Sequence, residues 1–97
     1  MSQIRIERAH QLGLSTARTY AQQWAQKATD KFGVQCRYEA GAAHDVLHFD
    51  GNGMEGQLHV SATALKLQAQ LGFLAAMFQD KIEAKLNAQF DEMVQSA

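Results

Sequence analysis

Alternation of apolar and polar residues through the middle of the chain constrains the fold most. Residues 34–39, 54–60 and 65–71 alternate in this way, and Val46–Phe49 forms a further short apolar segment. Because successive side chains on a strand point to opposite faces, these segments predict strands with one buried face. The connections are short, and the sequence contains no proline. The segments therefore predict an antiparallel meander.

The turn Asp50-Gly51-Asn52-Gly53 is the strongest hairpin signal, since Gly and Asn tolerate the positive φ of tight connections.

One strand and one helix precede the meander. Gln3–Glu7 alternates strictly and predicts a short strand. Apolar residues then recur at spacings of three and four over residues 17–32, with Ser15 as N-cap and Gly33 as C-terminal cap. The other face of this helix is polar, so we expect it to cover the sheet with one side.

The last third of the sequence, Leu71–Val94, predicts one helix with two apolar faces. At about 100° per residue, a broad face collects six residues that can bury against the sheet: Leu74, Phe78, Ile82, Leu86, Phe90 and Met93. Four others fall roughly opposite and form a candidate apolar contact surface: Phe73, Met77, Ala84 and Ala88. Alternatively, Phe73 tucks under the corner between strand and helix, and the alanines are simply good helix formers.

These elements predict a single α+β domain over residues 1–97, in the order β-α-β-β-β-β-α, with an antiparallel sheet and both helices on one face. The aromatic residues of the first helix are expected to form core, not a ligand site: Tyr20, Trp24 and Phe32. The opposite face of the sheet is expected to be solvated and polar: Gln35, Arg37, Glu39, Glu55, Gln57, His59, Lys66 and Gln68.

Composition excludes several classes of function. Nine basic and ten acidic residues give a net charge of −1, so no excess positive field attracts nucleic acid or an anionic membrane. The single cysteine, Cys36, fits a reducing compartment, and we expect a cytoplasmic protein. We expect no secretory signal in Met1–Glu7 and no transmembrane segment, because the longest apolar run, Leu71–Phe78, is far shorter than the roughly 20 residues of a membrane span.

No pattern of residues predicts a catalytic centre, a metal site or a cofactor. Cys36 lies mid-strand beside apolar neighbours, as a small buried hydrophobe does. The histidines have no ligand spacing and are expected to be exposed. Arg8, His10 and Arg18 form a candidate polar cluster where the first strand meets the first helix; a solvated edge with weak ion pairs is the alternative.

The chain resembles the polyhydroxyalkanoic acid system protein family along almost its whole length. The resemblance lies in these motifs: Ile4-x-Ile6-x-Arg8-x-His10-x-Leu12-Gly13, Ala17-Arg18, Gly56-x-Leu58-x-Val60, and Leu71-Gly72-Phe73-Leu74 followed by a helix with Ile82 and Asp91. The strand order is also similar to the β-α-β4-α arrangement of one half of TATA-binding protein and, elaborated, of helix-grip lipid-binding domains.

The resemblance implies a protein associated with bacterial polyester storage. From it and the apolar surface we expect a non-enzymatic accessory protein of the polyhydroxyalkanoate system, at the granule surface or bound to granule proteins. Two alternatives remain open. One is a helix-grip domain that holds an apolar acyl chain between sheet and helix. The other is a homodimer whose apolar surface is the subunit contact.

Overall fold

The computed structural model describes residues 2–95 of the chain. The first strand and helix are β1 (Ser2–Ala9) and α1 (Leu14–Phe32). The following strands are β2 (Gln35–Glu39), β3 (His44–Gly51), β4 (Met54–Ser61) and β5 (Ala64–Leu71). Two helices complete the order, α2 (Phe73–Ala76) and α3 (Gln79–Gln95).

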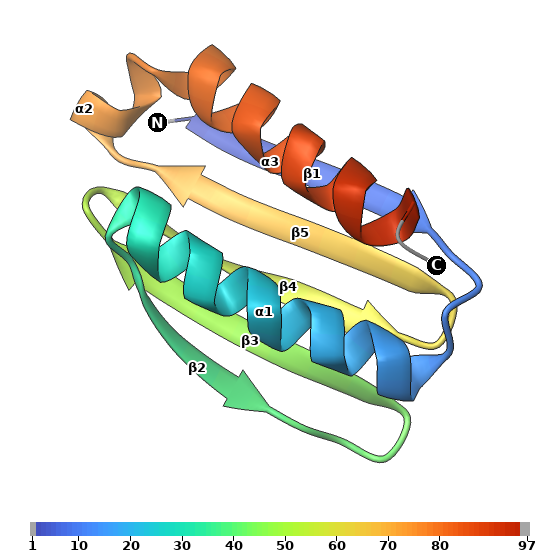
Figure 1. The fold of residues 1–97 in the computed structure, drawn as a ribbon. Helices are drawn as coiled ribbons and strands as arrows, with labels where there is room; N and C mark the ends of the chain where they lie inside the picture. Colours follow the sequence, from blue (N-terminus) through green and yellow to red (C-terminus); the bar gives the residue numbers. More distant parts are fainter. Residues whose placement is uncertain (1, 96–97) are drawn as a thin grey trace.

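The five strands form one antiparallel sheet in the order β1-β5-β4-β3-β2. The meander is continuous from β2 to β5, and β1 closes the far edge beside β5 (Figure 1). Helices α1 and α3 run side by side over the same face of the sheet (Figure 1). The predicted α+β class, the antiparallel sheet and the placement of the helices are therefore confirmed.

The core lies between this sheet and the two long helices. Trp24 of α1 is 1% exposed and lies edge-on to Phe49 of β3 and Phe90 of α3, with ring centroids 5.7 and 5.5 Å apart. Its indole Nε1 donates a hydrogen bond of 2.8 Å to Gln89 Oε1, which satisfies the buried polar atom. The aromatic face of α1 is thus core, as the sequence predicts; Tyr20 and Phe32 are half-buried against it.

The hairpin between β3 and β4 also fixes the end of α1. Asn52 has φ 51°, and its side-chain Nδ2 donates a hydrogen bond of 2.9 Å to the carbonyl of Phe32. Gly33 is left-handed and its N–H bonds to Thr29, so the predicted C-terminal cap is confirmed. The predicted N-cap is wrong. The helix begins one residue before Ser15, and the cap is Gly13, which has no side chain to contribute.

The prediction of one helix over Leu71–Val94 is also wrong. The N–H groups of Met77 and Phe78 bond three residues back, to Leu74 and Ala75, which tightens the chain into a turn. Helical bonding resumes from Ile82 to Phe78. The cause is tertiary: the chain leaves the sheet at the end of β5, and it must reverse there for α3 to run back along β1 (Figure 1). A straight helix could not do both.

Gly56 of β4 lies where any side chain would collide with the sheet. A Cβ built there would lie 2.1 Å from the carbonyl oxygen of Gln68, 2.8 Å from Ala69 Cα and 2.9 Å from the ring of Phe49. Two of these three atoms belong to the backbone of β5, so they cannot turn aside. We infer that β4 and β5 hold their close spacing only with glycine at this position.

We therefore expect Gly56→Ala to lower the free energy of unfolding by about 1–3 kcal/mol or more, because overpacking forces the backbone apart. Urea denaturation measures the change. Gly72→Ala is the control, since a Cβ there meets nothing closer than 3.4 Å and should change stability by less than about 1 kcal/mol. Equal stability of wild type and Gly56→Ala would contradict the close spacing of the two strands.

Candidate contact surfaces

The large apolar side chains that are exposed in the described part of the chain gather at α2. We define the α2 patch as four large residues on and just after this helix, with their exposed fractions: Phe73 (84%), Leu74 (73%), Met77 (70%) and Phe78 (56%). The sequence assigns Phe73 and Met77 to an exposed contact surface, and both are exposed. Leu74 and Phe78 were expected to be buried and are not, because the chain reverses at this point.

No helix among the described residues has the length and apolar content to cross a membrane.

The other two residues of the predicted apolar surface, Ala84 and Ala88, are also exposed but lie on α3. The turn at Met77–Phe78 therefore divides that surface between two helices. The α2 helix itself is anchored by the half-buried Ala75 and Ala76, which contact the core. Small residues thus hold α2 against the end of the sheet, while its large side chains point to solvent.

The predicted polar cluster divides among three environments. Arg8 Nε donates to Asp91 at 2.9 Å and its Nη2 to Asn87 Oδ1 at 2.6 Å, so this side chain joins β1 to α3. Arg18 bonds instead to Asp45 on β3. His10 is only 7% exposed, contrary to the expectation of exposed histidines. Its Nδ1 accepts a bond from Leu12 N–H, and its Nε2 has no hydrogen-bond partner among the described residues.

Asp45 is the most tightly held polar group in the core. Its side chain is fully buried and accepts bonds from Arg18 Nε (2.6 Å) and Nη2 (2.9 Å), from the Tyr38 hydroxyl (2.5 Å) and from the Gly41 N–H (2.9 Å). The hydrogen bonds from Arg18 hold the pKa of Asp45 well below its ordinary range, although burial acts in the opposite direction. Burial and the bond to the carboxylate raise the pKa of Tyr38. This network fastens the start of α1 to the β2–β3 connection.

Asp45 was not predicted as a paired buried carboxylate, although the alternation of residues in β3 contains the signal. Asp45 shares its strand face with Leu47 and Phe49, which both point into the core. A carboxylate on a buried face needs a cation and hydrogen-bond donors. Arg18 was recognised as a notable charge, but its partner lies 27 residues along the chain, and the residue spacing does not reveal such a pairing.

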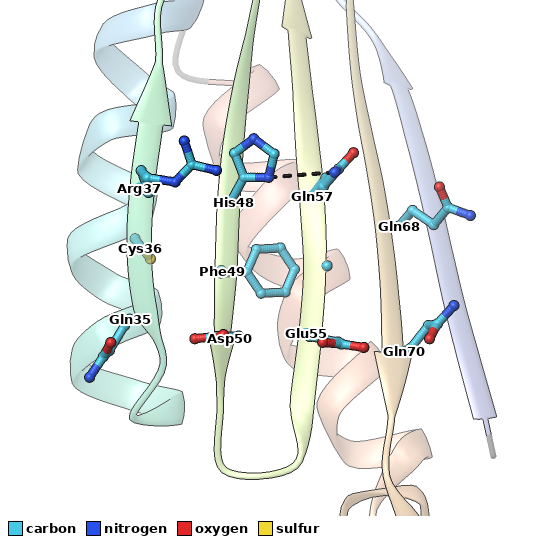
Figure 2. Close-up of a pocket in the computed structure, with 11 residues that line it drawn as sticks. Gln35, Cys36, Arg37, His48, Phe49, Asp50, Glu55, Gln57, Gln68 and Gln70 are labelled. Atoms are coloured by element: carbon cyan, nitrogen blue, oxygen red, sulfur yellow. Dashed lines mark hydrogen bonds between the residues drawn. The ribbon is translucent and has the colours of Figure 1, made fainter.

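The face of the sheet opposite the helices is polar and uncovered by other parts of the described chain. A hollow of about 660 Å³ lies on it, and we call this hollow the trough. Two rows of side chains line it, and each row runs across strands β2 to β5 (Figure 2). Each strand contributes one residue to each row, and these two residues are two positions apart. The acidic row contains Gln35, Asp50, Glu55 and Gln70; the basic row contains Arg37, His48, Gln57 and Gln68.

Hydrogen bonds orient part of the basic row. His48 Nε2 lies 3.1 Å from Glu39 Oε1, which also pairs with Arg37. His48 Nδ1 lies 3.4 Å from Gln57 Nε2, and Gln57 Oε1 lies 3.1 Å from His59 Nε2. The amide of Gln57 therefore sits between two imidazoles, with its NH2 group on the His48 side (Figure 2).

Groups suited to metal binding or nucleophilic chemistry are not assembled in the described chain. Residues 2–95 contain no cluster of three or more His, Cys, Asp or Glu side chains that could hold a metal ion. The half-buried Cys36 has its Sγ 3.7 Å from both the Ala25 carbonyl and Thr29 Oγ1, on the side of α1. The thiol therefore points away from the trough.

Comparison with known proteins gives one match. A protein-family model described as "Putative polyhydroxyalkanoic acid system protein" matches residues 4–94. No curated protein and no solved structure matches the chain significantly. The match extends from within β1 to Val94 of α3 and includes both the α2 patch and the trough.

We expect Asp45→Asn to lower the free energy of unfolding at pH 7 by about 2 kcal/mol, because it removes charge-assisted hydrogen bonds in the core. The pKa of Asp45 is lower in the folded than in the unfolded chain, where it is near 3.8. Its contribution is therefore complete above that pH and is lost as the pH falls below it. The gap between wild type and variant should narrow below about pH 4.

Urea denaturation at a series of pH values measures both effects. Asp50→Asn is the matched control, since Asp50 lies on the same strand but is exposed, and this change should alter stability by no more than about 0.5 kcal/mol. A gap between wild type and Asp45→Asn that stays constant from pH 7 to pH 2 would contradict the assigned role of the carboxylate.

Proposed function

Because the chain belongs to the polyhydroxyalkanoic acid system protein family, we propose that it is a binding protein of the polyhydroxyalkanoate storage system that attaches to the surface of cytoplasmic polyester granules. The attachment uses the α2 patch. The protein acts by binding and carries out no catalysis. The family supports the setting, and the exposed patch supports the mode of attachment.

The exposure of the α2 patch carries this proposal. Each large apolar side chain that moves from water into an apolar phase contributes about 1.5–3 kcal/mol. Four such side chains, each more than half exposed, therefore provide enough favourable free energy for stable adsorption. The large side chains project at the end of the sheet, with only Ala75 and Ala76 turned inward. Apolar side chains that project from the protein can adsorb to an extended polymer surface, because such a surface does not require a binding pocket of complementary shape.

The interior offers less support for an acyl-chain site between the sheet and the helices. Trp24, Phe49 and Phe90 fill the centre of that space with edge-to-face ring contacts. The trough, by contrast, is polar and lies on the far side of the sheet. Adsorption through α2 therefore accounts for the exposed apolar residues without any rearrangement of the core.

The arrangement of reactive groups supports a role in binding over one in catalysis. The carboxylate of Asp45 is saturated by Arg18, Tyr38 and a backbone N–H. The thiol of Cys36 faces α1. The Asp45 carboxylate is thus buried and paired, and the half-buried Cys36 thiol lies on the helix side of the sheet, away from the trough.

We expect Phe73→Asp/Met77→Asp to reduce the partitioning of the protein onto purified polyester granules about a hundredfold or more, because two apolar anchors are replaced by hydrated carboxylates. Co-sedimentation with granules measures the bound fraction. Ala84→Asp/Ala88→Asp is the matched control, since it adds the same two charges at exposed positions on α3 and should leave binding within about threefold of wild type.

The remaining outcomes decide between the alternatives. Equal recovery of wild type and the Phe73/Met77 variant would exclude the α2 patch as the attachment site. Sedimentation velocity without granules tests the homodimer. A dimer that dissociates on Phe73→Asp/Met77→Asp would assign the patch to a subunit contact and overturn adsorption to polymer.

A further inference from the structure

The trough separates two kinds of polar group on one small surface. Each strand contributes one residue to the acidic row and, two positions away, one residue to the basic row. Residues two apart on a strand are separated by about 7 Å. A small molecule lying between the rows therefore meets cationic and amide donors on one side and carboxylate acceptors on the other.

The carboxylates of the acidic row are not committed to the fold. Asp50 and Glu55 stand directly opposite each other on β3 and β4, and neither makes a hydrogen bond or ion pair with another residue in the described part of the chain. Their carboxylates point away from each other in Figure 2, as like charges do. Like charges at opposed positions destabilise a sheet. A bound group that donates a hydrogen bond would relieve this cost.

The basic row has donors available for an anion. Arg37 uses one nitrogen, Nη1, to pair with Glu39, which leaves Nε and Nη2 for a ligand. Its guanidinium extends from β2 toward His48, over the trough (Figure 2). The amide of Gln57 is oriented by His48 and His59, and its second N–H remains available. A guanidinium recognises carboxylate and phosphate groups, and an amide N–H can donate to the same anion.

The floor of the trough lets a ligand approach the backbone. It is formed by Cys36, Phe49 and Gly56, which lie between the two rows. The side chains of Cys36 and Phe49 point to the helix side, and Gly56 has none. A Cβ at Gly56 would also point to the helix side, toward the ring of Phe49, so the floor of the trough at these three positions is backbone.

We propose that the trough binds a small hydroxycarboxylic acid, with its carboxylate on Arg37 and Gln57 and its hydroxyl donating to the acidic row. Because the acidic and basic rows are separate, a ligand that contacts both needs two different polar groups. The choice of a hydroxy acid among molecules of that kind rests on the proposed function, because a polyhydroxyalkanoate is a polyester of hydroxy acids. The α2 patch and the trough then bind the polymer and its soluble monomer at separate sites.

An NMR titration of the isotope-labelled protein tests the site with three probes. 3-Hydroxybutyrate carries both groups, butyrate lacks the hydroxyl, and 1,3-butanediol lacks the carboxylate. We expect saturable shifts of the backbone amides around the trough with 3-hydroxybutyrate, weaker binding of butyrate and none of the diol. Binding of the diol as tight as that of the acid, or no saturable shift with 3-hydroxybutyrate, would overturn the proposal.

Two variants assign the roles. Arg37→Gln should weaken binding of 3-hydroxybutyrate about tenfold or more. Arg5→Gln is the matched control, since Arg5 lies on the same face of the sheet opposite Gln68 but does not line the trough; it should bind as wild type does. Equal effects of the two changes would reduce the site to general electrostatic attraction and contradict it.

The role of the acidic row is tested by the difference in affinity between 3-hydroxybutyrate and butyrate. Asp50→Asn/Glu55→Gln should bring 3-hydroxybutyrate and butyrate to the same affinity, because the preference for the hydroxyl resides there. A preference that persists in this variant would contradict the assigned orientation. Phe73→Asp/Met77→Asp should titrate as wild type does. Failure of granule binding and failure of the trough are thus distinguished, since each has its own variant and its own measurement.

Discussion

The division of the sheet into one apolar and one polar face determines the rest of the structure. Every strand alternates, so a single register places the apolar side chains of neighbouring strands together, as in the row formed by Leu47, Leu58 and Leu67. That face must be covered, and α1 and α3 cover it. The opposite face then stays polar, and its side chains are free for solvent or a ligand. Both candidate contact surfaces depend on this division. The trough lies on the polar face. The α2 patch lies where the chain passes from β5 in the sheet to α3 in the helical layer.

Local patterns in the sequence were sufficient to predict most of the fold. Alternation identified the strands, and Gly33 identified the end of α1, because each of these features depends on residues close together in the chain. The reversal at Met77–Phe78 could not be predicted in this way. The spacing of Phe78, Ile82 and Leu86 is helical throughout, and the break results from the reversal of the chain after the end of β5. Tertiary geometry, not local preference, overrides the helix there.

The candidate sites could likewise be predicted only where they depend on residues close together in the chain. Exposure of Phe73 and Met77 was one of two interpretations that the sequence left open; both side chains are exposed, but on the separate helix α2 and the turn after it, not on one long helix. The trough was not predicted as a site, although most of its side chains were assigned to the solvated face. Its two rows are formed by register between four strands, and register depends on how the turns pair distant segments. Asp45 was missed for the same reason, since its partner Arg18 comes from a different element.

The two surfaces lie close to each other, and this proximity follows from the topology. The acidic row is the row nearest the β3–β4 turn, and Gly53 in that turn accepts a hydrogen bond from the N–H of Gly72, immediately before α2. Gln70, at the end of the acidic row, is only three residues before Phe73. A protein that adsorbs through α2 therefore holds the acidic end of the trough close to the polymer. Under the two proposals together, the side of the trough proposed to bind the hydroxyl would face the polymer, and the side proposed to bind the carboxylate would face solvent.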